Sequence, residues 1–355
     1  MRQHHQKAGT NRQLNSAREL RPMSRKTQLV VIGLTVLAIA SAVSHLVTRT
    51  FKFRTEPVSA LTFGATNLPV GATAAGSSLM FYGVDWGGVS KVLGTRVRGW
   101  AVPGGSVQEM EFLQRAAPAA GYTLVGVSTY DLNENYISEF HAEIAPLRET
   151  LSSLQAAHAG WRYAKRVLSQ YPLKYLRVLF PSAGRSAHVM VGIREQLRSL
   201  RPQAAPEASE RAVVSSESNS HQDSINAWPA ARRLRNLGDM RGAAGSAFEF
   251  HGPKRESLFR FLRRGAAQGK MIVVVIPESP IYRQEFVTAD VGRRFEALLA
   301  EARQRTPEAF WVRLDSVPEL QSNNFYWDLV HLNAPGQALA TRTLLARLEA
   351  AGILR

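Results

Sequence analysis

The longest apolar stretch of the chain lies close to its N-terminus. Residues 29–47 carry no charge and are mostly aliphatic, and about nineteen such residues match the length that a helix needs to cross the hydrocarbon core of a bilayer. This pattern predicts a transmembrane segment at residues 29–48. A core helix of a soluble domain is one alternative, although a basic polar tail rarely precedes such a helix. A cleaved signal peptide is another, because Ala40, Ser41 and Ala42 resemble a cleavage site, but the apolar run continues beyond them.

The rest of the chain has the pattern of an α/β domain. Residues 49–72 are rich in small residues and turn formers and predict a stalk. From residue 73 to residue 355, short β-rich apolar runs alternate with amphipathic helical patterns, which indicates strands and helices around a mostly parallel sheet. We expect strands at residues 73–75, 97–102, 122–128, 271–277 and 310–314. We expect helices at residues 107–117, 144–170, 186–200, 256–267, 291–304 and 338–351.

One segment interrupts this pattern. Residues 201–227 consist largely of Ser, Ala, Glu, Gln and Asn and hold no aromatic residue. Such a composition buries too little apolar surface to order itself, so we expect a disordered insertion in the main domain. The insertion is either a solvated linker between two halves of one domain or a lid over a site.

The composition narrows the chemistry that the chain can perform. A chain of 355 residues is long enough for one large or two modest domains with a substantial core. Cysteine is absent, which excludes disulfide scaffolds, cysteine-ligated zinc, iron–sulfur clusters and cysteine nucleophiles. We expect no metal and no cofactor, because four histidines of the main domain have no partner at metal-binding spacing. These are His141, His158, His188 and His251.

The positive charge of the chain is concentrated at its beginning. Of the formal net charge of +16, residues 1–54 hold +9 and the other 301 residues only +7. Beyond residue 54 the sequence has no basic stripe interleaved with stacking aromatic residues, which argues against a nucleic-acid partner. Seven basic residues precede the apolar run and three follow it, so the positive-inside rule predicts a cytoplasmic tail at residues 1–28 and an exported main domain.

Two segments at expected strand ends carry candidate catalytic side chains. Gly76, Ser77 and Ser78 follow the first expected strand, in a tight turn that presents a hydroxyl beside a free backbone N–H. Near the other end of the chain, Asp328 stands three residues before His331. That spacing lets the carboxylate bond one ring nitrogen and leaves the other free to take a proton from a serine. Because open α/β sheets bind ligands at the carboxyl ends of their strands, these residues form a candidate Ser–His–Asp triad.

Other side chains near strand ends are candidates for the surroundings of a site. Tyr326 and Trp327 either line an acyl or sugar pocket or belong to the core. Asn133 lies where a substrate loop follows a strand, although Asn is also an ordinary turn residue. Glu278 and Ser279 follow the expected strand at 271–277, where they shape the site without a catalytic role.

The order of these segments resembles the SGNH, or GDSL-like, hydrolase superfamily. The resemblance covers most of residues 73–351 and implies a three-layer α/β/α sandwich with a mostly parallel sheet. The segment Gly-Ser-Ser-Leu at residues 76–79 is similar to the first block of the family and makes Ser78 the implied nucleophile. Asp328 and His331 match the last block without adjustment.

The two middle blocks of the family bear on the oxyanion hole. Residues 101–106 look like the second block, whose Gly104 would donate its N–H to the oxyanion together with the N–H of Ser78. The third block departs from the family pattern, because Ser128 stands where the family has an Asn donor. Ser128, or Asn133 further on, would have to replace it.

A single anchor, an exported domain and the Gly-Ser-Ser form of the first block look most similar to the family members that decorate cell-surface polymers. Examples are alginate and cellulose O-acetylation proteins and the D-alanyl transfer protein of lipoteichoic acid synthesis. The resemblance implies a serine acyltransferase or esterase acting on O-acyl groups of envelope polysaccharide, with a membrane-bound O-acyltransferase as partner. A non-catalytic glycan-binding or assembly factor and a plain esterase for small soluble esters are the alternatives.

Overall fold

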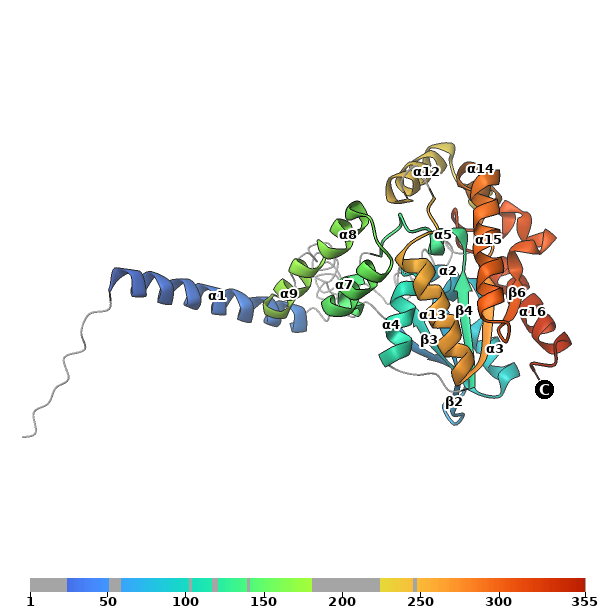
Figure 1. The fold of residues 1–355 in the computed structure, drawn as a ribbon, viewed down its shortest axis with the longest axis horizontal. Helices are drawn as coiled ribbons and strands as arrows, with labels where there is room; N and C mark the ends of the chain where they lie inside the picture. Colours follow the sequence, from blue (N-terminus) through green and yellow to red (C-terminus); the bar gives the residue numbers. More distant parts are fainter. Residues whose placement is uncertain are drawn as a thin grey trace, which may run out of the picture.

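A six-stranded sheet organises the part of the chain that follows the N-terminal helix (Figure 1). The computed structural model describes residues 24–50, 59–101, 104–116, 121–138, 141–180, 224–244 and 248–354. The strands are β1 (Ser59–Phe63), β2 (Val70–Gly76), β3 (Arg96–Ala101), β4 (Gly121–Val127), β5 (Gly269–Val275) and β6 (Phe310–Arg313). Their order is β1-β3-β2-β4-β5-β6, and every neighbouring pair is parallel except β1 with β3. The predicted α/β class with a mostly parallel sheet is confirmed.

The buried strands are apolar on both faces. In β5 the five residues from Met271 to Val275 are all buried, and β4 ends in the same way. Such continuous apolar runs are typical of parallel strands that helices cover on both sides. All five expected strands coincide with β2 to β6 to within a few residues, but β1 lies inside the segment that we expected to be a stalk. Ser59–Phe63 is instead an edge strand, because it pairs antiparallel with β3.

The helices that connect the strands form two packed groups. One group contains α2 (Ser78–Gly83), α3 (Trp86–Leu93) and the C-terminal α16 (Ala334–Ala350), with α16 in contact with the other two. The other contains α4 (Val107–Ala116), α13 (Pro253–Gln268) and α15 (Ala289–Arg305), with α13 in contact with the other two and with β5. Short helices α5 (Thr129–Leu132) and α14 (Pro280–Phe286) follow the ends of β4 and β5.

The long helix expected at residues 144–170 is wrong, because the chain forms several shorter helices there. These are α6 (His141–Ile144), α7 (Leu147–Ala156) and α8 (Trp161–Leu168), followed by α9 (Tyr171–Leu179). Pro146 is the N-cap of α7, and proline disfavours helical backbone in the residue before it. The second break has a left-handed residue, His158, and Gly160 as the N-cap of α8. The helix expected at 186–200 lies outside the described residues.

The predicted insertion at 201–227 was expected to extend too far, because its last three residues form regular structure. Residues 201–223 lie outside the described residues, but Ile225–Ala227 form a turn of 3₁₀ helix, η1. The side chain of Ile225 is fully buried, and its N–H donates to the carbonyl of Tyr326. The helix α12 (Ala230–Ala244) follows directly and carries exposed arginines.

The N-terminal helix α1 (Arg25–Thr50) extends away from the α/β body in Figure 1. Within the described part of the chain it alone is long and apolar enough to cross a membrane, with a mean hydropathy of 2.2 over Arg25–Leu46. Over residues 25–46 its side chains are exposed, except the half-buried Ser41 and the buried Ser44. The length expected for a membrane anchor is therefore present, while the side on which the main domain lies stays a prediction.

Candidate active site

The register of the sheet brings three loops together at one edge. Gly76, the last residue of β2, pairs with Ala101, the last residue of β3, and Ala75 pairs with Val125 of β4. The chain segments after β2, β3 and β4 therefore leave the sheet side by side. The central strand β2 is also the point at which the strand order reverses, and such switch points form ligand crevices in open α/β sheets.

The first of these loops presents Ser78. Ser77 has extended backbone and caps α2, with its hydroxyl accepting the N–H of Leu79 at 3.1 Å. Ser78 is thereby the first residue of α2, directly after a sharp change of chain direction. Its N–H donates to no acceptor among the described residues, because the first N–H groups of a helix have no partner within that helix. The turn thus presents a hydroxyl and an unpaired N–H at the same place.

His331 lies within hydrogen-bonding distance of both other residues of the predicted triad. The hydroxyl oxygen of Ser78 is 2.8 Å from Nε2 of His331, and Nδ1 of His331 is 2.6 Å from Oδ2 of Asp328. Residues 253 positions apart in sequence thus meet in one relay. The side chains of His331 and Asp328 keep 15% and 17% of their exposure, so the relay is accessible from outside. This geometry allows His331 to take the proton of Ser78 while Asp328 holds the ring.

Asp328 is fixed by its own loop. Its Oδ1 accepts the backbone N–H groups of Val330 and His331 at 2.9 and 2.7 Å, which leaves Oδ2 for the imidazole. Burial alone raises the pKa of Asp328, but the attraction of His331 and the three hydrogen bonds outweigh it, so the pKa is lowered from its usual value. The carboxylate is therefore ionised and accepts a hydrogen bond from Nδ1–H of His331.

Aromatic rings hold His331 in place. The indole of Trp327 stacks on the imidazole, with ring centroids 5.1 Å apart and planes at 13°. Tyr82, on α2, meets the imidazole edge-on at 5.6 Å. Sequence reasoning missed Tyr82, for which the only available signal was its position one helical turn after Ser78. Trp327 thus lies next to His331, and its place in an acyl or sugar pocket stays a prediction.

Two other candidate substrate residues are buried. Tyr326 has no exposure, and its hydroxyl donates to the carbonyl of Leu320 at 3.0 Å, so it belongs to the core. Asn133 is also fully buried, and its side-chain oxygen accepts the N–H groups of Asn135 and Glu249. Neither residue can contact a substrate in this arrangement.

The two candidate oxyanion residues besides Ser78 differ in their conformation and in their hydrogen bonds. Gly104 has a φ of 57°, and a Cβ there would overlap the hydroxyl of Tyr136, so both conformation and space require glycine. Ser128 is buried and caps α5; its hydroxyl accepts the N–H of Asp131 and donates to the carboxylate of Asp131 at 3.2 Å. The Ser128 hydroxyl is therefore engaged in the cap, which counts against its expected role as the third donor.

The segment after β5 forms hydrogen bonds to two other loops of the site. Glu278 is fully buried, and its carboxylate accepts the hydroxyl of Thr129 at 2.7 Å and the N–H of Tyr130 at 2.9 Å, both on α5. The hydroxyl of Ser279 donates to the carbonyl of Leu329 at 2.6 Å, between Asp328 and His331. We expected these residues to shape the site, but their partners are distant in sequence and no spacing predicts them.

A buried charge lies beneath the triad. Burial raises the pKa of Asp131 to about 6, although hydrogen bonds from Ser77 and Ser128 and the positive charges of Lys254 and His331 lower it. The ammonium group of Lys254, itself buried, donates to the carbonyl of Asp131 at 3.1 Å. α13 thus supports the loop after β4 from below.

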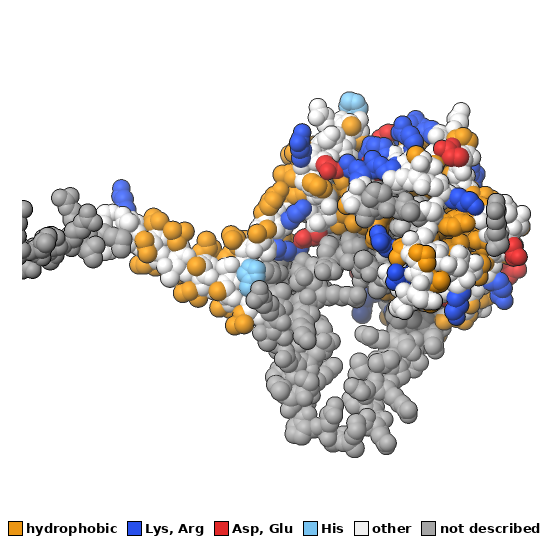
Figure 2. Space-filling model, turned by 90° about the horizontal axis from the view of Figure 1, so that it is seen from below, with side chains coloured by type: hydrophobic (Ala, Val, Ile, Leu, Met, Phe, Trp, Pro, Cys, Tyr) orange, Lys and Arg blue, Asp and Glu red, His pale blue; other side chains and the backbone are white. Residues whose placement is uncertain are grey.

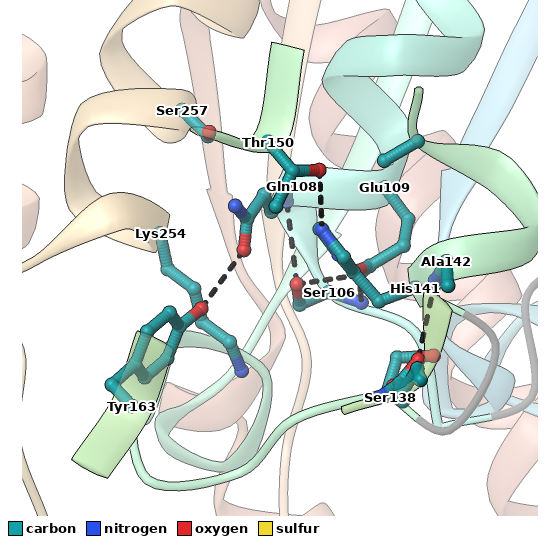
Figure 3. Close-up of polar contacts among 12 residues, drawn as sticks. Ser106, Gln108, Glu109, Ser138, His141, Ala142, Thr150, Tyr163, Lys254 and Ser257 are labelled. Carbon is teal, nitrogen blue, oxygen red and sulfur yellow. Dashed lines mark hydrogen bonds and ion pairs between the residues drawn. The ribbon is translucent and has the colours of Figure 1, made fainter. Parts of the chain in front are cut away.

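A second polar network surrounds the first turn of α4 (Figure 3). Ser106 and Glu109 form a capping box at the start of α4, in which Glu109 accepts both the N–H and the hydroxyl of Ser106. The other oxygen of Glu109 is 2.5 Å from Nδ1 of His141, whose Nε2 is 3.1 Å from the hydroxyl of Thr150. Burial raises the pKa of Glu109, but the bonds from His141 and Ser106 outweigh it and lower the pKa overall. The network fixes α4 just after Gly104.

The described residues contain no group of three or more His, Asp or Glu side chains arranged to hold a metal ion. The two ring nitrogens of His141 are engaged by Glu109 and Thr150. No known family model matches the chain, and no curated protein matches it. The case for a function therefore rests on the geometry of the site.

Proposed function

We propose that this chain is a membrane-anchored serine acyltransferase or esterase that acts on O-acyl groups of cell-envelope polysaccharide through an acyl-serine intermediate. The observation that carries the proposal is the Ser78–His331–Asp328 relay, with distances of 2.8 and 2.6 Å. The mostly parallel sheet and the position of Ser78 after the central strand β2 support an SGNH-like α/β/α sandwich. The apolar α1 supports an anchor, with its N-terminus cytoplasmic and the main domain on the outer side.

The first half of the reaction forms the acyl-serine. Nε2 of His331 takes the proton of Ser78 as the hydroxyl oxygen attacks the ester or thioester carbonyl. The carbonyl oxygen becomes an oxyanion, and the N–H groups of Ser78 and Gly104 are its proposed donors. As the bond from the carbonyl carbon to the leaving oxygen or sulfur breaks, His331 returns the proton to the leaving group.

The second half releases the acyl group. A sugar hydroxyl or a water gives its proton to His331 and attacks the acyl carbon. Ser78 leaves and recovers the proton from His331, so the enzyme is regenerated without any redox step. Transfer and hydrolysis use the same residues and differ in the attacking oxygen. A membrane-bound O-acyltransferase is the proposed supplier of the acyl group.

The proposal is tested by labelling of the purified full-length chain with a fluorophosphonate, which phosphonylates activated serines. We expect labelling of wild type, loss in Ser78→Ala and retention in Ser316→Ala. Ser316 is an exposed serine whose hydroxyl bonds only the carbonyl of Arg313, so its variant is a matched control. No labelling of wild type, under conditions that label a control esterase, would refute the proposed catalysis.

A second candidate function is a non-catalytic assembly factor that binds glycan and a membrane partner. It is favoured by the engagement of Ser128, which leaves two backbone N–H groups as oxyanion donors. The acyl content of surface polysaccharide, measured in cells with and without the gene, distinguishes the acyltransferase, the esterase and the assembly factor. Loss of acyl groups in cells that carry Ser78→Ala indicates transfer, a gain indicates hydrolysis, and no change indicates assembly.

A further inference from the structure

The helices beside α1 carry an unusual concentration of exposed hydrophobic side chains. Nine large hydrophobic residues outside α1 are exposed among the described residues, and six of them lie on α7, α8 and α9. Soluble surfaces rarely gather such side chains without a binding partner. The six are Leu151, Trp161, Tyr175, Leu176, Val178 and Leu179.

The same helices are basic. Residues 161–180 contain five Lys or Arg and no acidic residue. Arg166 and Lys174 donate to backbone carbonyls, and Arg177 pairs with Glu143. Arg162 and Lys165 are exposed and make no ion pair with any described residue. Aromatic, aliphatic and basic side chains together are typical of helices that lie in the plane of a membrane interface.

The contact between α9 and α1 fixes the depth of this surface. The hydroxyl of Ser41 on α1 donates to the carbonyl of Leu179, at the last turn of α9, at 2.5 Å. Ser41 precedes Val47, the end of the apolar run, by six residues, or about 9 Å along a helix. Interfacial helices bury their apolar face roughly 5 to 10 Å into the boundary between headgroups and acyl chains. The end of α9 therefore lies at interfacial depth whenever α1 crosses the bilayer.

The surface is continuous with the anchor in the space-filling view. Figure 2 shows orange hydrophobic and blue basic side chains side by side where the body adjoins α1. A groove of about 670 Å³ between α7 and α9 adds to it, with Leu147, Leu151 and Tyr175 on its walls and the exposed Arg148 at its edge. The apolar end of α9 thus adjoins the proposed membrane span, and the basic residues of α8 lie on the helix that precedes it in the chain.

We propose that α8 and α9 dock on the leaflet from which the main domain emerges, where they bind anionic phospholipid. The apolar side chains of α9 enter the acyl boundary, and Arg162 and Lys165 meet headgroup phosphates. This inference rests on the proposed insertion of α1 but is independent of catalysis at Ser78. A lipid surface fits better than a protein partner, because the depth follows from α1 itself and phosphates match the unpaired cations.

The absence of cysteine allows a direct test in the full-length chain. Single cysteines at Val178, Val36 and Val92 are labelled with an environment-sensitive fluorophore, and one chain is placed in each lipid nanodisc. Val36 on α1 reports insertion of the anchor, and Val92 on α3 is an exposed valine of the body. We expect the label at 178 to shift to the blue and to be quenched by brominated lipid, as at 36, while the label at 92 remains aqueous.

Lipid charge is varied in the same experiment. Discs that contain phosphatidylglycerol should hold more of the inserted α9 than discs of phosphatidylcholine alone. Arg162→Gln and Lys165→Gln should each lower the ratio of inserted to free α9 in anionic discs about fivefold, and leave phosphatidylcholine discs unchanged. Circular dichroism of each variant checks that the helices persist.

Three results would overturn the proposal. A label at 178 that stays aqueous in anionic discs, while the label at 36 is in lipid, shows that α9 does not dock although α1 is inserted. A label at 178 that is shielded only in native membranes, and that crosslinks there to a second polypeptide, assigns the surface to a protein partner instead. An aqueous label at 36 would refute the proposed anchor itself and with it the docking, while fluorophosphonate labelling of Ser78 tests catalysis separately.

Discussion

Asp328 uses its two carboxylate oxygens for different partners, and Asp328→Asn is expected to separate them. Oδ1 accepts two backbone N–H groups at 2.9 and 2.7 Å, and Oδ2 accepts Nδ1–H of His331. An asparagine has one oxygen and one NH₂ group. Placing the NH₂ group against the two backbone donors would leave them unsatisfied, at a cost of about 1 to 3 kcal/mol each. The amide oxygen should therefore keep the Oδ1 position, and the NH₂ group should face the imidazole.

This orientation reverses the proton pattern of the relay. A donor facing Nδ1 forces the ring proton onto Nε2, which then donates to Ser78 instead of accepting its proton. Loss of the correct tautomer in a Ser–His–Asp relay lowers the rate by about 10⁴-fold, or about 5.5 kcal/mol in activation free energy. The variant should keep its fold, because both backbone N–H groups are still bonded.

The second-order rate of fluorophosphonate labelling measures the effect, with Ser316→Ala as the control. Nitrogen-15 NMR of His331 provides a readout that does not depend on activity, since wild type should carry its ring proton on Nδ1 and the variant on Nε2. A labelling rate for Asp328→Asn within tenfold of wild type, or an unchanged tautomer, would contradict the reasoning.

Three further changes test the surroundings of the triad. Gly104→Ala should lower the labelling rate by about 100-fold, because the new methyl group would overlap the Tyr136 hydroxyl and displace the loop that carries a proposed oxyanion donor. Adding Tyr136→Phe to this variant should restore part of the rate, and no recovery would count against a clash between the methyl group and the hydroxyl. Ser279→Ala should lower the free energy of unfolding in urea by about 1 to 3 kcal/mol, because the carbonyl of Leu329 loses a buried hydrogen bond, and an unchanged midpoint would contradict this. Burial raises the pKa of Glu278 to about 7 from 4.5, so its contribution to stability is present at low pH and is lost as the pH rises through 7. From pH 5 to pH 8.5 the free energy of unfolding of wild type should fall by about 2 to 3 kcal/mol relative to that of Glu278→Gln. If the free energies of unfolding of the two proteins change with pH in parallel, this prediction is wrong.

The fold was predictable where burial is continuous along the chain. β5 has no polar residue between Met271 and Val275, and parallel strands require such runs. β1 escaped prediction because Ser59–Phe63 is short and is held by pairing with β3, a contact that local pattern does not report. The break of the expected helix at 144–170 was visible in Pro146 and Gly160, but the amphipathic pattern on either side outweighed them in the interpretation.

The site was predictable only in its most local part. Asp328 and His331 are neighbours through their spacing, and Ser78 was located by its turn and by resemblance. The groups that hold these residues came from elsewhere: Ser279 bonds a carbonyl fifty residues away, and Glu278 reaches α5 over 149 residues. Ser128 was expected to face the site because of its position in the third block. Its hydroxyl bonds Asp131 instead, since serine is a favoured N-cap and the acceptor lies three residues on.

The short connection between α1 and β1 limits how far the α/β domain can lie from the membrane. Nine peptide links separate Thr50 from Ser59, and a fully extended chain covers at most about 3.6 Å per residue, so the sheet begins no more than about 32 Å from the end of α1. With α1 in a bilayer, this tether confines the nucleophile to a thin layer above the lipid. If the chain acts as proposed, polymer that has diffused into the medium lies out of range, and a polysaccharide chain is modified only while it passes close to the surface from which it emerges.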